Sequence, residues 1–543
     1  MALRAVLAMR DSVSKAAGAG AGAGTGARVP FLRLRAIAGA RAAASALVCG
    51  LGLLGAAGDA TASVKTPQSP AAEQAQRGPD GSTPLQWAVF KGDADEVKRL
   101  LRAGADVREA NAYGAMPMQL AAETGDVAIL KLLLEAGTDV DSPNAEGQTA
   151  LMAVARTGNV EAAKLLLKHG AKVNTVEQFG GQTALMWATA RRHPQMMKLL
   201  LSKGAQINAR SVVRNWERHI TAEGRAKDVN TGGLTPLLYA ARENCMECVS
   251  VLLDRHVDIN LADPDGVAPV TIAIMNANWD VAKRLIVAGC DVNQWDIYGQ
   301  GPLYAAVDMG DARSGGRASI DPMNEADGKE IIRMLLDRGA NPNLQLFFRP
   351  ANRAGAGAGT LVSRGTTPLI RAAANDDVEL VKLLLAHGAE INLHQADGQT
   401  ATMAALGARR ARGGGNNEEG AVEVLRVLHA AGADVNVVAK AHHLQRVRGG
   451  TALHYATRIG WRKAIEELVS YGADVNAKDP DGLTALDYAM ARGYIPFLQQ
   501  RAPVREDLAK LLRGSGATVE LARTPDWPPV GPPIGYEATI WPL

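Results

Sequence analysis

Few side chains in this sequence have types and spacings that could do chemistry. Cys245 and Cys248 are separated by two residues, as in redox and metal-binding cysteine pairs. No second pair completes a zinc site, and Val249 stands where haem attachment needs a histidine. We therefore expect two structural thiols at Cys245 and Cys248, with a local disulfide in an oxidising compartment as the alternative. Cys290 is expected to be buried.

Other chemical motifs are incomplete. Residues 263–266 and 479–482, both Asp-Pro-Asp-Gly, suggest calcium loops but lack the remaining ligands and the closing glutamate of an EF-hand, which favours simple turns. His442 and His443 have no carboxylate or cysteine at ligand spacing. A nucleophile elbow, a P-loop, a His-Glu-x-x-His motif and a dinucleotide-binding fingerprint are all missing from the sequence. We predict no catalytic residues, no metal, no cofactor and no enzyme activity.

Composition limits the fold and the partners. The chain has 543 residues, with 6 Phe, 9 Tyr and 8 Trp, which is too few large aromatics to fill several separate cores of ordinary domains. The apolar fraction of 47% is interrupted by 57 Gly, as in a stack of short helices. Because 59 Lys and Arg balance 56 Asp and Glu to a net charge of +3, the charge excess of a nucleic-acid-binding protein is missing.

The main feature of the sequence is internal repetition. The string Gly-x-Thr-Pro/Ala-Leu, or a close variant, begins at eleven glycines, and seven of the ten intervals are 33 or 34 residues. The glycines are Gly81, Gly114, Gly147, Gly181, Gly233, Gly266, Gly299, Gly365, Gly398, Gly449 and Gly482. Each string is followed by Val-x-x-Leu-Leu-x-x-Gly-Ala-Asp-Val-Asn or a variant. About 430 residues with this pattern resemble the ankyrin-repeat family, which implies an all-α solenoid of about eleven helix-turn-helix units that acts by binding proteins.

The pattern also has a physical explanation of its own. The threonine can cap the first helix and the proline follows at the first helical turn, where a missing N–H costs nothing. In the second helix, Val160, Ala163 and Leu167 lie at helical spacing and form one apolar stripe. Gly170 then ends that helix as a residue that tolerates the left-handed conformation. Because one unit cannot bury its stripe alone, stability must come from stacking against neighbours.

Insertions distinguish this chain from the plain repeat. Insertions in repeat arrays fall at loops and tend to lie on a binding face, although neutral surface elaboration is the alternative. Three insertions are predicted in the projecting turns, at about 210–231, 345–364 and 437–447. Three more are predicted between paired helices, at about 312–327, 408–420 and 495–504.

Candidate partner-binding residues follow from the resemblance and from the insertions. In the ankyrin architecture, first-helix residues just before the inter-helix turn face a concave groove, and the turn tips lie beside it. We predict partner contacts at the groove and tip positions and at aromatics of the insertions. The candidates are Phe90, Lys91, Arg156, Arg191, Trp216, Arg242, Trp295, Tyr298, Met309, Phe347, Phe348, Arg458 and Arg492. The basic excess in the groove suggests a partner with an acidic surface, although an ordinary solvated helix face is the alternative.

The N-terminus predicts export. A basic stretch from Arg33, an apolar stretch from Ala42 to Ala57 and the small residues Ala60-Thr-Ala62 follow in the order of a secretory signal. We expect cleavage after Ala62 and a periplasmic or extracellular protein of bacterial origin. An uncleaved signal that anchors the chain in an inner membrane is the alternative, and membrane contact is expected only in that case.

These expectations define four segments: a leader with a signal peptide at 1–62, a polar linker at 63–79, the solenoid at 80–520 and a Pro- and Trp-rich tail at 521–543. The tail is expected either to cover the last helix pair or to dock on another protein. The predicted function is non-catalytic binding of a protein of unknown identity by a monomer. The first alternative is a membrane-anchored scaffold. The second, ranked below it, is an enzyme site built from the inserted loops.

Overall fold

The structure is a computed structural model that describes residues 77–217, 228–309, 326–348, 364–406, 418–440, 449–491, 494–495, 500–501 and 504–518. The predicted leader, most of the predicted linker and the predicted tail lie outside the described residues, as do most insertions. The chain divides into two compact units, Met1–Glu146 and Gly147–Leu543.

Unit 1 contains two helix pairs in its described part, and within it the first helices pack on each other and the second helices pack on each other. The pairs are α3 (Pro84–Lys91) with α4 (Ala94–Arg102), and α5 (Pro117–Thr124) with α6 (Val127–Glu135).

Unit 2 contains nine helix pairs in its described part, so the two units together hold the predicted number of eleven. They are α7 (Ala150–Thr157) and α8 (Val160–Lys168), α9 (Ala184–Ala190) and α10 (Pro194–Ser202), α11 (Pro236–Arg242) and α12 (Met246–Leu253), α13 (Pro269–Met275) and α14 (Trp279–Val287), α15 (Pro302–Met309) and α16 (Gly328–Asp337), α17 (Pro368–Ala373) and α18 (Val378–Ala386), α19 (Ala401–Leu406) and α20 (Glu418–Ala430), α21 (Ala452–Ile459) and α22 (Arg462–Ser470), and α23 (Ala485–Ala489) and α24 (Glu506–Gly514).

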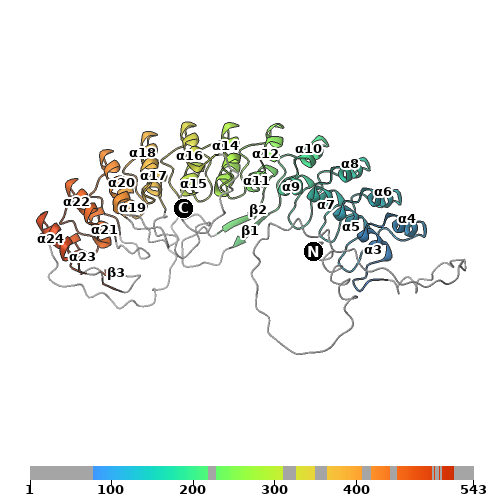
Figure 1. The fold of residues 1–543 in the computed structure, drawn as a ribbon, viewed down its shortest axis with the longest axis horizontal. Coiled ribbons are helices and arrows are strands. Elements are labelled where there is room, and N and C mark those ends of the chain that lie inside the picture. Colours follow the sequence, from blue (N-terminus) through green and yellow to red (C-terminus); the bar gives the residue numbers. More distant parts are fainter. Residues whose placement is uncertain are drawn as a thin grey trace, which may run out of the picture. The chain divides into compact units, whose positions relative to one another are not determined.

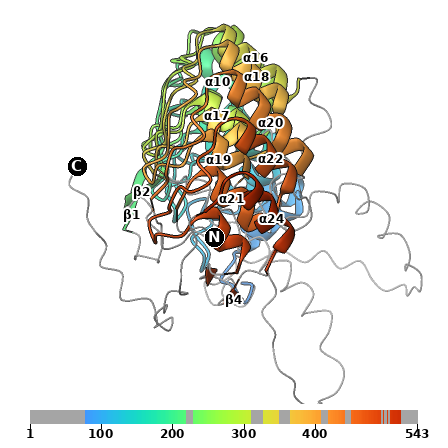
Figure 2. The ribbon, with the colours of Figure 1, turned by 90° about the vertical axis from the view of Figure 1, so that its left-hand side faces the viewer.

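Within unit 2 the helices form two rows. The second helices, such as α10, α12, α14 and α16, lie in one row, and the first helices, such as α9, α11 and α15, lie in the row beneath it (Figure 1). Seen along the stack, α16, α18, α20 and α22 follow one another on one side, and the hairpin of β1 (Val213–Glu217) and β2 (Asp228–Gly232) lies on the other (Figure 2). The apolar core runs between the rows and is continuous from Met403 to Ala517 in the last repeats.

The predicted caps start the first helices. The Oγ1 of Thr83 accepts a hydrogen bond from the backbone N–H of Gln86 at 3.2 Å, and the Gln86 side chain accepts one from the N–H of Thr83 at 2.7 Å. The amide of Gln86 then donates to the carbonyl of Ala115 in the next repeat at 2.8 Å. One polar side chain therefore satisfies the start of its own helix and joins it to the following turn.

A ladder of asparagine side chains joins consecutive repeats of unit 2. The Nδ2 of Asn436 donates to the carbonyl of Gly472 at 3.0 Å, and its Oδ1 accepts from the N–H of Asp474 at 2.8 Å. Both bonds recur at the same repeat position in Asn174, Asn293, Asn343, Asn392 and Asn476. At Asn208 and Asn260 the accepted bond is the one formed. Unit 1 has Arg108 and Asp141 at this position.

Backbone hydrogen bonds form a second ladder along the turn tips. The N–H of Ile297 donates to the carbonyl of Asp265 at 2.8 Å, and the N–H of Phe347 donates to the carbonyl of Tyr298 at 2.8 Å. The first insertion extends one tip as a hairpin, in which β1 (Val213–Glu217) pairs antiparallel with β2 (Asp228–Gly232). A second short hairpin, β3 (Tyr494–Ile495) with β4 (Gln500–Arg501), lies between α23 and α24.

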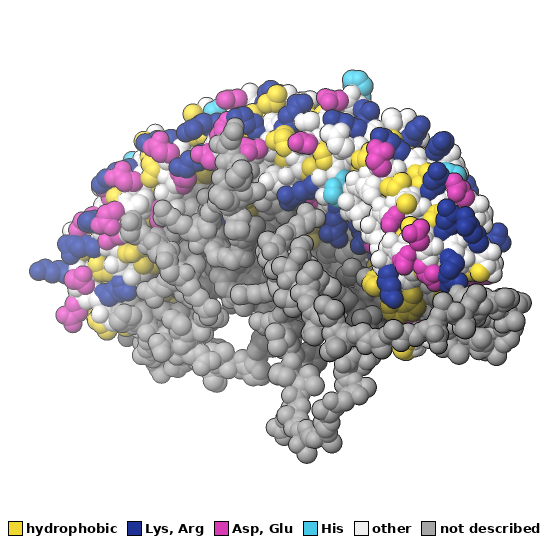
Figure 3. Space-filling view, turned by 45° about the vertical axis from the view of Figure 1, so that its right-hand side comes forward, with side chains coloured by type: hydrophobic (Ala, Val, Ile, Leu, Met, Phe, Trp, Pro, Cys, Tyr) yellow, Lys and Arg dark blue, Asp and Glu magenta, His cyan; other side chains and the backbone are white. Residues whose placement is uncertain are grey.

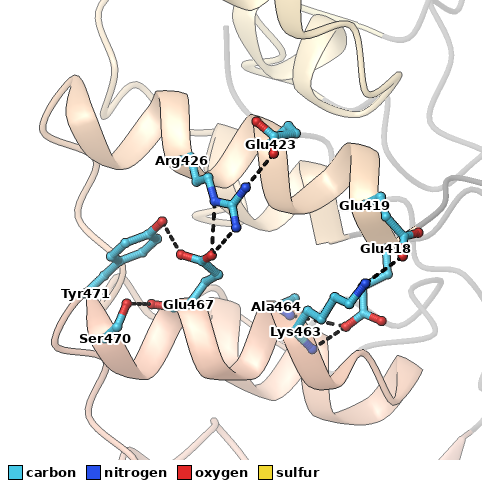
Figure 4. Close-up of polar contacts among 9 residues, drawn as sticks. All are labelled: Glu418, Glu419, Glu423, Arg426, Lys463, Ala464, Glu467, Ser470 and Tyr471. Atoms are coloured by element: carbon cyan, nitrogen blue, oxygen red, sulfur yellow. Dashed lines mark hydrogen bonds and ion pairs between the residues drawn. The ribbon is translucent and has the colours of Figure 1, made fainter.

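One helix receives its cap from the neighbouring repeat. Trp461 stands at the N-cap of α22, where its side chain makes no capping hydrogen bond. The Oε1 of Glu418, the first residue of α20, accepts hydrogen bonds from the backbone N–H groups of Lys463 and Ala464 (Figure 4). Beside it, the Nζ of Lys463 forms an exposed ion pair with Glu419 at 2.9 Å. The carboxylate of Glu418 thus replaces the missing side-chain cap and complements the helix dipole.

We predict that Asn436→Asp destabilises the protein by about 1–2 kcal/mol, because the carboxylate keeps the accepted bond but loses the donated one and faces the Gly472 carbonyl. Asn260→Asp is the matched control: Asn260 makes only the accepted bond, which a carboxylate keeps, so this substitution should cost clearly less. Urea unfolding followed by circular dichroism measures both. Equal costs for the two variants would show that the donated bond does not hold neighbouring repeats together.

We also predict that Glu418→Ala lowers the free energy of unfolding by roughly 1 kcal/mol, the usual cost of losing a helix cap. Glu419→Ala, which removes an exposed ion pair from the adjacent position, should change it by less than about 0.5 kcal/mol. Thermal unfolding of both variants is the measurement. Indistinguishable midpoints would mean that Glu418 does not act as the cap of α22.

Candidate functional site

The predicted groove arginines of unit 2 lie at or near the ends of consecutive first helices. Arg191 directly follows α9 and is exposed, as is Arg242 at the end of α11. Arg156 is half-buried near the end of α7, and its carbonyl contacts the Nε2 of His193 at 3.1 Å. Arg242 lies over the ring of Tyr239, with its Cζ 5.0 Å from the ring centre, and pairs with Glu243 at 2.8 Å. Basic side chains therefore recur along three adjacent repeats.

The two candidates of unit 1 differ from each other. Phe90 is half-buried and packs edge-to-face on Trp87, with ring centres 6.0 Å apart. Lys91, the last residue of α3, is exposed. Phe90 is thus partly used in internal packing, while Lys91 is accessible.

A buried ion pair lies further along unit 2. The Nε of Arg371 on α17 donates to the Oδ1 of Asp308 on α15 at 2.8 Å, and both side chains are only 4% exposed. Met309, the candidate next to Asp308, is half-buried. The sequence analysis did not single out Arg371, although a charged residue stands there at the repeat position that holds Trp187, Tyr239 and Tyr455 elsewhere. A charged residue at a position that otherwise holds aromatic residues was the sequence signal that could have identified Arg371.

Arg458 has a different environment from the other groove arginines. It is half-buried near the end of α21, and its guanidinium carbon lies 5.4 Å from the ring centre of Tyr488. Burial lowers the pKa of its guanidinium, because removal from water disfavours the charged form. Its Nη1 is enclosed and donates to no acceptor. Arg492, the last groove candidate, lies outside the described residues.

The turn-tip candidates only partly match the prediction. Trp295 is 50% exposed, and its ring contacts that of Phe347 edge-to-face at 5.2 Å; Phe347 and its neighbour Phe348 are also exposed. The expectation that Tyr298 is an exposed anchor is wrong, since its side chain is only 6% exposed. Its N–H donates to the Oδ1 of Asp296 and its carbonyl accepts from Phe347, so the residue is enclosed between two tips. The side chain of Trp216 lies outside the described residues.

At the turn tip that carries Trp295 and Tyr298, the carboxyl of Asp296 has a raised pKa. Its Oδ1 accepts hydrogen bonds from the N–H groups of Tyr298 and Gln300, at 2.8 and 2.9 Å. Burial, with a smaller contribution from the nearby charges of Asp263 and Asp265, raises the pKa of the Asp296 carboxyl to about 7. At neutral pH the tip beneath Trp295 is therefore less negative than its aspartates suggest.

The two neighbouring cysteines are joined in a disulfide, with 5.2 Å between their Cα atoms. This is the arrangement that the sequence analysis held as the alternative to separate thiols. Cys245 is the N-cap of α12, and its Sγ accepts a hydrogen bond from the N–H of Cys248 at 3.3 Å, in the role that Asp93 and Asp126 fill elsewhere. Cys290 is a buried free thiol, and burial raises its pKa to about 12. Such a thiol has little nucleophilic thiolate at neutral pH.

Within the described ranges, no group of three or more His, Cys, Asp or Glu side chains could hold a metal ion. Among those same residues, no helix is both long and apolar enough to cross a membrane. On the face drawn in Figure 3, basic and acidic side chains alternate over the coloured surface without separating into large fields of one sign.

Comparison with known sequences identifies the family. The family model described as "Ankyrin repeats (3 copies)" matches residues 53–144, 136–211, 218–296, 237–346, 325–437 and 415–517. Because these matches cover most of the chain, the protein belongs to the ankyrin-repeat family. The first match begins before residue 80, where the sequence analysis placed the start of the solenoid.

The chain is similar to parts of several known proteins. It is 29% identical to mouse ankyrin repeat and SOCS box protein 16 over 41% of this chain and 47% of that protein, and 34% identical to the mouse B-cell lymphoma 3 protein homolog over 41% and 50%. It thus spans about half the length of these relatives. A crystal structure of the ankyrin repeat domain of Bcl-3 is 23% identical, with a TM-score of 0.36, and covers 48% of this chain and 100% of that one.

Proposed function

We propose that this protein binds another protein without catalysis, through the groove side of the first helices of unit 2. Membership of the ankyrin-repeat family supports a binding role. The observation that carries the proposal is the recurrence of Arg156, Arg191 and Arg242 at or near the ends of the first helices of three consecutive repeats, with two of the three exposed. Guanidinium groups bind carboxylates in planar, bidentate pairs, so this row fits an acidic segment of a partner. The exposed Trp295, Phe347 and Phe348 at the turn tips supply apolar anchors beside it.

We predict that Arg156→Glu, Arg191→Glu and Arg242→Glu together abolish partner capture. Replacing Lys168, Lys198 and Lys203 by Glu is the matched control, because it makes the same change in net charge at exposed positions on or next to the second helices. Quantitative affinity capture from extract of the source cells, with differently labelled samples for each variant, should show partners that the wild type and the lysine variant retain. A loss of about tenfold or more is expected for the arginine variant alone. Equal recovery with both variants would refute the groove assignment.

We further propose that the protein is exported. The basic, apolar and small-residue stretches near the N-terminus support this, and so does the disulfide between Cys245 and Cys248, because disulfides persist mainly in oxidising compartments. A scaffold that stays anchored through an uncleaved signal is the second candidate. Sequencing the N-terminus of protein from its native cells distinguishes them. A chain that starts at Ser63 is the expected result, whereas an intact 42–57 segment in the membrane fraction would favour the anchor.

A further inference from the structure

The two bonded cysteines lie at the start of α12 in unit 2. Cys245 is the N-cap of this helix, and Cys248 lies in its first turn. Cys245 is 6% exposed, whereas Cys248 has no exposed surface. The turn around Cys245 reaches the surface of the protein, since Asn244 and Met246 are half-buried and Glu247 is exposed. A reagent in solution can therefore approach Cys245 but not Cys248.

The position of Cys245 holds a negative charge in other repeats. At the start of α6, a carboxylate oxygen of Asp126 accepts a hydrogen bond from the N–H of Ile129 at 3.0 Å. The Sγ of Cys245 accepts the equivalent bond from the N–H of Cys248 at 3.3 Å. Aspartates cap α4, α16 and α18 in the same way, and they are Asp93, Asp327 and Asp377. Because free N–H groups and the helix dipole both favour an anion there, this position would stabilise a thiolate on Cys245.

The helix start does not depend on the disulfide for its shape. The bridge joins residues three positions apart, and the stabilisation that a disulfide provides decreases as the loop it closes becomes shorter. At α6 and α18 an aspartate cap begins the helix in place of the bridge. A reduced Cys245 would continue to cap α12 as a thiolate. Reduction therefore exchanges one stabilising contact for another and does not open the repeat.

Cys290 provides a contrast within unit 2. It is a buried free thiol, and burial, with a smaller contribution from the charge of Asp291, raises its pKa to about 12. Its surroundings oppose a thiolate, whereas the start of α12 favours one at Cys245. The two environments predict opposite reactivities for these two residues.

We propose that Cys245 and Cys248 form a reversible redox site that exchanges electrons with a dithiol. One thiol of the dithiol loses its proton to water and attacks the Sγ of Cys245, which forms a mixed disulfide and releases Cys248 as a thiolate that water protonates. The second thiol, after losing its proton, attacks the dithiol sulfur of the mixed disulfide and releases Cys245 as a thiolate. Two electrons have then passed to the protein, and the dithiol has become a disulfide.

The reverse sequence, with a disulfide as the oxidant, restores the bridge. This redox site goes beyond the proposed binding of a protein and does not require it. The two proposals fail separately, because the capture experiment with the arginine variants does not involve the cysteines.

The first test measures the redox equilibrium of the full chain in mixtures of reduced and oxidised dithiothreitol. Free thiols are trapped by alkylation and assigned to individual cysteines by mass spectrometry, while circular dichroism follows the fold. The bridge should open and close reversibly with the helical signal unchanged, and Cys290, the internal control, should stay unlabelled. Opening of the bridge only in urea concentrations that unfold the chain would show a purely structural disulfide and overturn the proposal.

The second test compares two variants that each keep one thiol, Cys248→Ser and Cys245→Ser. At pH 7, Cys245 in the first variant should react with iodoacetamide about tenfold or more faster than Cys248 in the second. Serine keeps a capping oxygen at position 245, so both variants retain a cap on α12. Equal rates, or no labelling of Cys245, would overturn the proposal. Should a variant fail to fold, the dithiothreitol equilibrium of the wild type decides.

Discussion

Side-chain amides of asparagine connect the repeats of unit 2 to one another. A helix pair of this size cannot bury its apolar face alone, so each pair must meet its neighbour in a fixed register. An asparagine such as Asn343 donates to the glycine carbonyl that ends the next second helix and accepts from a backbone N–H two residues later. The two bonds fix the offset between neighbours, and the tip-to-tip backbone bonds reinforce it. Everything displayed on the groove and the tips depends on that offset.

With the register fixed, the environment of each arginine on the first helices depends on the side chains that surround it. Arg371 meets Asp308 and becomes part of the core, whereas Arg242 meets Glu243 at the surface and remains accessible. Arg458 lies over the ring of Tyr488, whose hydroxyl donates a hydrogen bond to Asp479. Residues of one type at related repeat positions thus differ in role because their neighbours differ.

The sequence predicted the number of helix pairs, their caps and their order, because the Thr-Pro start and the Gly-Ala-Asp end are local signals that act within a few residues. It also placed Arg191, Arg242 and Trp295 on accessible surface. It failed where burial depends on contacts between repeats. Tyr298 is enclosed by the tip of the following repeat, and Arg371 finds its partner 63 residues away.

The carboxylate of Glu418 at the start of α22 limits how freely these units could be exchanged. Repeat arrays are commonly treated as interchangeable modules that recombination can add, delete or reorder. Here the unit with Trp461 has lost the means to begin its own second helix, and the preceding unit supplies it. A duplication or excision that parted the two would leave bare N–H groups at the helix start. These two repeats are therefore expected to be inherited together.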